Sequence, residues 1–188
     1  KTAAEIGSFT VPENRTKASS KAITLRFVRF KSTNPNPGSP IIYLAGGPGG
    51  SGIGTARGTR YDLFQELRSV ADVIAFDQRG TGLSDGPPRY PGAWFIDPTK
   101  VMTVEEMRPI IQEATRKAAI FFAENDCDLS GYNTSESADD LNDLRLALKA
   151  KKISLWGISY GSHLSLTAIK RHEKHLDRVV IAGIEGYD

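Results

Sequence analysis

The hydrophobic positions of this chain form two kinds of pattern, which together predict a sheet of strands separated by helices. Four short, continuous apolar runs are typical of strands buried on both faces: 41–45, 72–77, 153–156 and 178–183. Upstream of them, residues 9–30 also read as strands. Ile23, Leu25 and Phe27 there alternate with polar neighbours, as expected of a half-buried strand.

Helical spacing of apolar residues fills the gaps between these runs, at 61–70, 103–125 and 162–172. In the longest helix the apolar residues of one stripe are Met107, Ile110, Ile111, Ala114 and Ala118. A fourth helix follows Ser137, which we interpret as its N-cap, because ADDLNDLRLALKA is acidic at its start and basic at its end. This alternation predicts an α/β fold with a mostly parallel, doubly wound sheet.

Composition and charge narrow the class of protein. The 188 residues suit one domain, and 39% hydrophobic with 24% charged residues predicts a packed core. The net charge is only +2 and the basic residues are scattered, which argues against nucleic-acid binding, and no apolar run is long enough to span a bilayer. No leader opens the chain, and the compartment stays open, with a secreted or periplasmic one slightly favoured. Cys127, the single cysteine, is interpreted as an inert buried thiol, although it could pair outside the chain.

Three loops leave the carboxyl ends of the predicted parallel strands: 46–54, 77–86 and 157–161. Ligands of open α/β sheets bind at this edge, so we expect the chemistry there. The last loop, GISYG, is typical of a nucleophile elbow, a strand–turn–helix element that exposes a catalytic serine. Gly157 and Gly161 would leave room for strand and helix to cross beside Ser159. The alternative is a glycine-rich turn with an ordinary serine.

An acyl-transfer serine also needs hydrogen-bond donors for the oxyanion. The backbone N–H of Tyr160 would be one donor, and AGGPGGSG after the first buried strand can supply the second. Gly47 is the preferred second donor, with Gly46 as the next choice. The alternative is a flexible connector, although five glycines within GGPGGSG exceed what a connector requires.

A dinucleotide-binding domain is the rival interpretation of the same loop. Gly47, Gly49 and Gly52 satisfy G-x-G-x-x-G, and Asp77 ends the next strand, near the place of a ribose-binding acid. Pro48 inside the fingerprint argues against it, and the idea leaves GISYG without a purpose.

The loop DQRGTGLSDG contains further polar residues. Asp77 and Arg79 are expected to pair across this turn and brace the mouth of the site. A structural role for Asp77 is favoured over a catalytic one, and Ser84 is interpreted as a turn residue.

GGPGGSG, DQRGTGLS and GISYGS, in this order and spacing, resemble the α/β-hydrolase fold and, more narrowly, its proline iminopeptidase and tripeptidyl aminopeptidase branch. YNTSESADDLNDLRLAL is similar to the segment that leads to the nucleophile strand in that branch. The resemblance runs from about Phe9 to Gly183. It implies hydrolysis of an amide or ester through an acyl-enzyme on Ser159, with the N–H groups of Tyr160 and Gly47 as the oxyanion hole. One departure is Ala45, where many relatives have histidine, and this difference bears on fine specificity rather than on the mechanism.

The general base and acid of such a triad follow the serine in this fold. His172 and His175 would lie roughly 18–24 Å along the helix from Ser159, so they are interpreted as solvated surface residues. His163 is interpreted as a packing or surface residue. Glu185 follows the last strand and could approach the site, for example to hold a substrate amine.

We therefore expect residues 1–188 to be the N-terminal part of a single hydrolase domain, without its cap and last strands. The triad Asp or Glu and His would come from a complementary C-terminal polypeptide, which would also cover the apolar edge strand RVVIAG. Aminopeptidase activity on peptides is the first choice, carboxylester hydrolysis the second, and a non-catalytic fragment or binding module the third. No metal or cofactor is expected, since no ligand cluster is present.

Overall fold

The computed structural model describes residues 3–58, 60–92 and 99–186, which fall into two compact units. The larger unit comprises residues 1–86 and 131–188, and the smaller unit comprises residues 87–130. The smaller unit is thus an insertion in the sequence of the larger one, and each is described by itself below.

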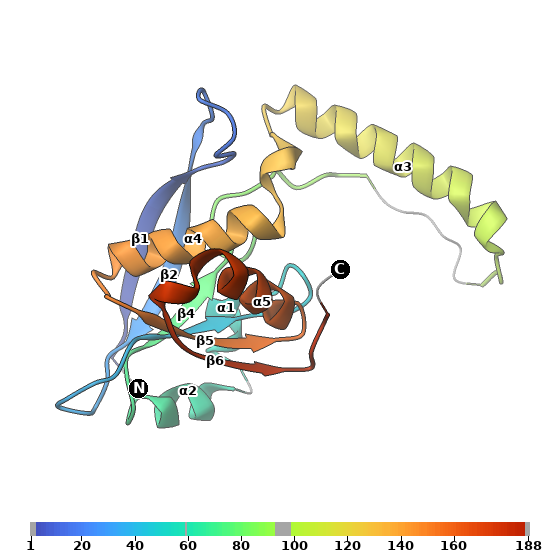
Figure 1. Ribbon diagram of the computed structural model, residues 1–188. Coiled ribbons are helices and arrows are strands. Elements are labelled where there is room, and N and C mark those ends of the chain that lie inside the picture. Colours follow the sequence, from blue (N-terminus) through green and yellow to red (C-terminus); the bar gives the residue numbers. More distant parts are fainter. Residues whose placement is uncertain (1–2, 59, 93–98, 187–188) are drawn as a thin grey trace. The chain divides into compact units, whose positions relative to one another are not determined.

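The larger unit is built on a six-stranded sheet (Figure 1). Its strands are β1 (Glu5–Pro12), β2 (Ala22–Phe30), β3 (Ile41–Leu44), β4 (Val73–Asp77), β5 (Ile153–Ile158) and β6 (Leu176–Ala182). They lie in the order β1-β2-β4-β3-β5-β6. β1 pairs antiparallel with β2, and β2 with β4, whereas β3, β4, β5 and β6 run parallel. The predicted mostly parallel sheet is confirmed.

Helices cover both faces of this sheet (Figure 1). They are α1 (Gly52–Thr55), α2 (Tyr61–Leu67), α4 (Thr134–Ala147) and α5 (Tyr160–His172). Two short 3-10 helices complete the list: η1 (Leu129–Gly131) precedes α4 in the sequence, and η2 (Glu173–His175) follows α5. Leu141 of α4 and Leu164 of α5 belong to the core on one face. Ile53 of α1 and Phe64 of α2 belong to a second core on the other face.

The alternation of side chains along the inner strands separates these two cores. On β3, Ile42 and Leu44 join the α4–α5 core, whereas Tyr43 joins the α1–α2 core. On β4, Ile74 joins the first core and Ala75 the second. Both faces of these strands are buried, which is why their sequences read as continuous apolar runs.

The predicted cap of α4 is wrong. Asn133, not Ser137, caps the helix, because its side chain accepts a 2.9 Å hydrogen bond from the N–H of Glu136. Ser137 lies inside the first turn and is buried. Asn is among the strongest N-cap residues, and its side chain reaches the N–H three residues on.

The fourth apolar run does not form a fully buried strand. β6 lies at one end of the strand order, and Val180 within it is 64% exposed. Leu176 is the single buried residue of this strand. The strand pairs on one side with β5, and its other edge has no strand partner among the described residues.

The smaller unit contains α3 (Val104–Glu124), which begins with a capping box between Thr103 and Glu106. Four residues of the predicted stripe are half-buried, namely Met107, Ile110, Ala114 and Ala118, whereas Ile111 is exposed. Near the helix end, the ring of Phe121 packs edge-on against Tyr90, with 5.4 Å between centroids. Cys127 follows and is buried. Among the described helices, none combines the length and the apolar character needed to cross a bilayer.

Candidate active site

Ser159 occupies the sharp turn between β5 and α5. Its backbone has φ 54° and ψ −126°, a conformation that a residue with a side chain adopts only at a cost of about 1–3 kcal/mol. The turn is held on both sides of the residue. The Ser159 N–H donates to the carbonyl of Ala182 at 3.0 Å, and the N–H of Ser162 donates to the Ser159 carbonyl at 2.7 Å. The strained serine is therefore a feature that the surrounding structure imposes.

The two glycines of GISYG explain how strand and helix cross so closely. A side chain at Gly161 would overlap the carbonyl oxygen of Leu44 in β3. A side chain at Gly157 would overlap the carbonyl of Gly161 and the hydroxyl of Ser165. The helix can therefore pack against the neighbouring strands only because both positions lack Cβ atoms.

The glycine-rich loop after β3 lies against the nucleophile. A Cβ atom at Gly46 would lie 2.7 Å from Ser159 Cβ and 2.9 Å from the carbonyl oxygen of Ile158. Gly47 follows with φ 124°, a backbone conformation that favours glycine. The N–H of Gly50 donates to the Gly46 carbonyl at 3.0 Å and closes the turn. Backbone groups of this loop are thus beside Ser159, as an oxyanion hole requires.

Glu185 also lies beside the nucleophile, on the segment that follows β6. Ser159 Oγ donates a 3.0 Å hydrogen bond to Glu185 Oε1. The backbone N–H of Glu185 donates to Ser162 Oγ at 2.9 Å, and Ser162 Oγ donates in turn to the Ser159 carbonyl at 2.6 Å. Ser162 is completely buried. Ser162 is not among the residues predicted from the sequence, although GISYGS places it one turn after the nucleophile.

Ser159 is strained, lies between two close-packed glycines and faces a glycine-rich loop at the carboxyl edge of a parallel sheet. This is the arrangement of a nucleophile elbow. Residues 39–187 match the alpha/beta hydrolase fold family. The chain belongs to the α/β-hydrolase fold family. This finding excludes the dinucleotide-binding interpretation of the same loop.

Among curated proteins, this chain is similar to a tripeptidyl aminopeptidase of Streptomyces lividans, with 30% identity over 96% of its length. It is also similar to the serine protease Hip1 of Mycobacterium tuberculosis, with 25% identity over 94% of the chain. The chain spans 35% of the length of each of these relatives.

Solved structures share the fold of this chain at low identity. An α/β hydrolase from Novosphingobium aromaticivorans superposes with a TM-score of 0.57 at 15% identity, over 96% of this chain and 44% of that one. A variant of the epoxide hydrolase of Vigna radiata gives 0.55 at 16% identity, over 94% of this chain and 38% of that one. At these identities the comparison shows the fold alone.

The predicted pairing of Asp77 with Arg79 is wrong. Asp77 is fully buried, and its Oδ1 accepts hydrogen bonds from Ser51 Oγ at 2.7 Å and from the N–H of Ile53 at 3.0 Å. Its Oδ2 accepts from the N–H of Leu83 at 2.8 Å. A short carboxylate can satisfy these nearby backbone donors better than it can reach a guanidinium that points elsewhere. Asp77 therefore ties the glycine-rich loop after β3 to the loop after β4, and no ribose hydroxyl could reach it.

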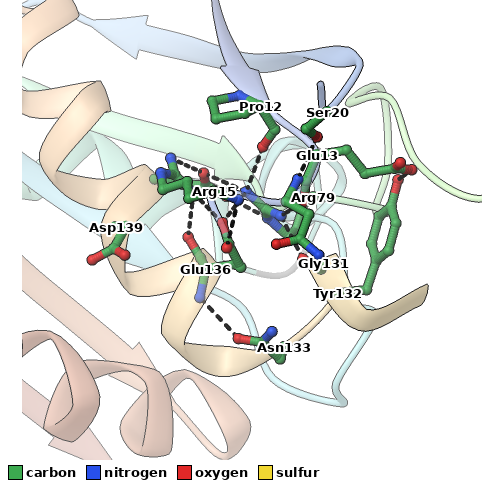
Figure 2. A network of polar contacts seen from close by, with 12 residues as sticks. Pro12, Glu13, Arg15, Ser20, Arg79, Gly131, Tyr132, Asn133, Glu136 and Asp139 are labelled. Carbon is green, nitrogen blue, oxygen red and sulfur yellow. Dashed lines mark hydrogen bonds and ion pairs between the residues drawn. The ribbon is translucent and has the colours of Figure 1, made fainter. Parts of the chain in front are cut away.

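Arg79 points instead to the start of α4 (Figure 2). Its Nε and Nη2 each donate at 2.7 Å to the carboxylate of Asp140, and its Nη1 donates to the backbone carbonyls of Glu13 and Gly131. Arg79 and Asp140 are almost completely buried. One feature of the sequence indicates this contact. Glu136 and Asp140 are one helical turn apart on α4, so their carboxylates lie on the same face and can bind a buried arginine.

Arg15, from the β1–β2 connection, completes this network (Figure 2). Its guanidinium bonds to Glu136, Asp140 and Asp143 on one face of α4. Burial opposes the charged form of Arg15, but the bonds to Asp140 and Asp143 outweigh this and raise its pKa. The network therefore ties the β1–β2 connection, the loop after β4 and α4 together.

Ser84 is a turn residue, as predicted. Its Oγ donates to the carbonyl of Asp77 at 2.6 Å and accepts from the N–H of Arg26 at 2.8 Å. Both bonds are backbone contacts of the kind that serine makes in turns.

The histidines of the chain lie as follows. The ring of His163 stacks on that of Tyr160, with 5.9 Å between centroids, and its Nδ1 donates to the carbonyl of Gly186 at 2.9 Å. His172 lies at the far end of α5, where its Nε2 is 2.8 Å from Asp139. His175 lies beyond it in η2, where burial and the nearby Arg145 lower its pKa. Neither of the last two is placed to act on Ser159.

Proposed function

We propose that this chain carries the nucleophile of a serine hydrolase that releases residues from the N-termini of peptides through an acyl-enzyme. The observation that carries the proposal is the strained conformation of Ser159, because such strain persists where the surrounding structure imposes it and clusters at active sites. The names of the relatives, tripeptidyl aminopeptidase and serine protease, support a peptide substrate. They also support a place in the branch of proline iminopeptidases and tripeptidyl aminopeptidases.

In the proposed reaction Ser159 Oγ attacks the carbonyl carbon of the scissile bond and forms a tetrahedral intermediate. The N–H groups of Tyr160 and Gly47 would stabilise its oxyanion, with Gly46 as the alternative donor. The hydroxyl proton passes to a general base and then to the leaving amine, which departs as the acyl-enzyme forms. Water, activated by the same base, then hydrolyses the ester on Ser159.

The base and its acid partner would come from a complementary polypeptide of the same hydrolase. Two features of the described residues support this. The outer edge of β6 has no strand partner there. An apolar groove of about 440 Å³ also opens between α2 and the last strands, and its apolar lining includes Leu63, Trp156 and Val180. Apolar surface of this kind marks an interface in soluble proteins.

Glu185 would hold the amino group of the substrate. Its carboxylate lies beside the nucleophile on the exposed segment after β6, where it can pair with an ammonium group. An aminopeptidase needs such an anchor to select free N-termini.

The proposal is tested on the protein that contains both this chain and its complement. After treatment with a fluorophosphonate probe, intact mass spectrometry should show one probe mass on the wild-type chain and none on Ser159→Ala. Ser165→Ala, on the same helix, is the control and should be labelled like the wild type. A wild-type protein that stays unlabelled would refute the nucleophile. Labelling of the 188-residue chain alone at the full rate would refute the need for a complement.

A further inference from the structure

The segment that follows β6 is fastened to the nucleophile elbow at several points. Besides the bond between Ser159 and Ala182, the N–H of Glu185 donates to Ser162 Oγ and the Gly186 carbonyl accepts from His163. Gly183 has φ 61°, a backbone conformation that favours glycine, and it lies next to the nucleophile, since a Cβ there would be 3.7 Å from Ser159 N. The Glu185 backbone is therefore fixed relative to Ser159.

Ser162 is the residue that joins the two. Its buried hydroxyl donates to the Ser159 carbonyl at 2.6 Å and accepts from the Glu185 N–H at 2.9 Å. One side chain thus satisfies a carbonyl of the strained turn and an amide of the segment that carries the carboxylate. Alanine at this position would leave both backbone groups without that partner.

The resulting distance between nucleophile and carboxylate restricts where a substrate amine can bind. The carbonyl carbon of the cleaved bond must lie on Ser159 Oγ, and the α-nitrogen of the same residue is about 2.5 Å from that carbon. Glu185 Oε1, at 3.0 Å from Ser159 Oγ, is within reach of this nitrogen. The amine of a tripeptidyl group is two residues further away, about 7 Å in an extended chain.

We propose that Ser162 is a positioning residue, which holds Glu185 at the distance that selects removal of a single N-terminal residue. This inference rests on the proposed function and adds the length of the released group. The preferred substrate is then a peptide whose first residue carries both the free ammonium group and the attacked carbonyl. The ammonium group would replace the Ser159 hydroxyl as the donor to Glu185.

The experiment compares kcat/KM of the full protein on three anilides: alanyl, N-acetyl-alanyl and alanyl-alanyl-alanyl. Wild type should prefer the alanyl anilide over both others. Glu185→Gln should reduce the ratio of alanyl to N-acetyl-alanyl turnover by about 10–100-fold, as expected for a lost hydrogen bond to a charged group. Ser162→Ala should reduce the same ratio by a smaller factor.

Ser165→Ala is the matched control, because Ser165 is equally buried and its hydroxyl bonds to the Gly161 carbonyl, away from Glu185. It should leave the ratio unchanged even if it lowers stability. A wild-type preference for the tripeptidyl anilide, or equal losses on all three substrates in Ser162→Ala, would overturn the inference while Ser159 labelling upholds the proposed function. If no substrate is turned over and Ser159 is not labelled, both are wrong.

Discussion

Arg79 and Asp140 form a buried, bidentate ion pair, in which Nε lies 2.7 Å from Oδ2 and Nη2 lies 2.7 Å from Oδ1. Arg79 leaves the loop after β4, and Asp140 lies on α4, on the far side of the inserted smaller unit in the sequence. The remaining donor, Nη1, bonds to two backbone carbonyls, so the guanidinium has few free hydrogens. Loss of Arg79 would be costly, because the buried carboxylate of Asp140 would keep only Arg15 as a cation and two backbone carbonyls would lose their donor.

Arg79→Met should therefore lower the free energy of unfolding by about 3–5 kcal/mol, which denaturant titration of the full protein would measure. Arg116→Met is the control, because Arg116 pairs with Glu113 on the exposed surface of α3 and their bond lowers the pKa of Glu113 to about 2. The control should leave the midpoint unchanged, since exposed pairs contribute little. An equal change in the free energy of unfolding in the two variants would contradict the stabilisation assigned to the buried pair of Arg79 and Asp140.

Ser159→Gly should make the fold more stable by about 1 kcal/mol, because glycine relieves the cost of φ 54° at that position. Ser159→Ala keeps the Cβ atom and hence the strain, so thermal unfolding should separate the two variants. Both should lose fluorophosphonate labelling. A glycine variant no more stable than the alanine variant would show that the turn carries no strain.

Gly161→Ala should destabilise the protein by about 1–3 kcal/mol or more, since its methyl group would overlap the Leu44 carbonyl of the neighbouring strand. It should also lower the rate of probe labelling, because α5 must move away from β3. Gly38→Ala offers a comparison, as its Cβ would have one neighbour, the Val70 carbonyl oxygen at 3.6 Å. Unfolding midpoints and labelling rates of the two variants would check this, and a normal elbow in Gly161→Ala would contradict the packing described here.

Asp139 should make the stability depend on pH. Partial burial opposes its ionisation, but the hydrogen bonds from Arg171 and His172 outweigh this and lower its pKa. A carboxyl whose pKa is lower in the folded state stabilises the fold above its unfolded pKa of about 3.9 and loses that contribution as pH falls through the folded pKa.

Asp139→Asn should therefore be less stable than wild type at neutral pH, and the difference should shrink as the pH falls below about 4. Denaturant titrations at a series of pH values would measure it. A difference that stays constant down to the acid transition would mean that ionisation of Asp139 does not contribute.

Features with local determinants were the most predictable from the sequence. The elbow around Ser159 could be predicted because strand, glycines and helix are contiguous. The cap of α4 was assigned wrongly, because both Asn133 and Ser137 are good capping residues and only the geometry distinguishes them. The apolar residues of β6 predicted a buried strand. Burial, however, depends on which elements pack against the strand, and the sequence of the strand alone does not specify them.

The polar links between distant segments could not be predicted. Arg79 is 61 residues from Asp140, and Arg15 is 125 residues from the same carboxylate. The spacing of the acidic residues on α4 indicates a site that binds a cation, but it does not indicate which of the many arginines binds there. The contact between Ser159 and Glu185, 26 residues apart, is the exception, because both residues follow neighbouring parallel strands and the approach of Glu185 to the site was expected from that order.

The bond from Arg79 to the Gly131 carbonyl closes a 52-residue stretch of chain at its base. Because the entropy of closing a flexible loop rises only with the logarithm of its length, doubling such a stretch costs only about 0.6 kcal/mol. Residues 87–130 can therefore vary in length during evolution at little cost in stability. The sheet that presents the serine does not have to change with them, because the bond between Arg79 and Gly131 fixes both ends of the stretch.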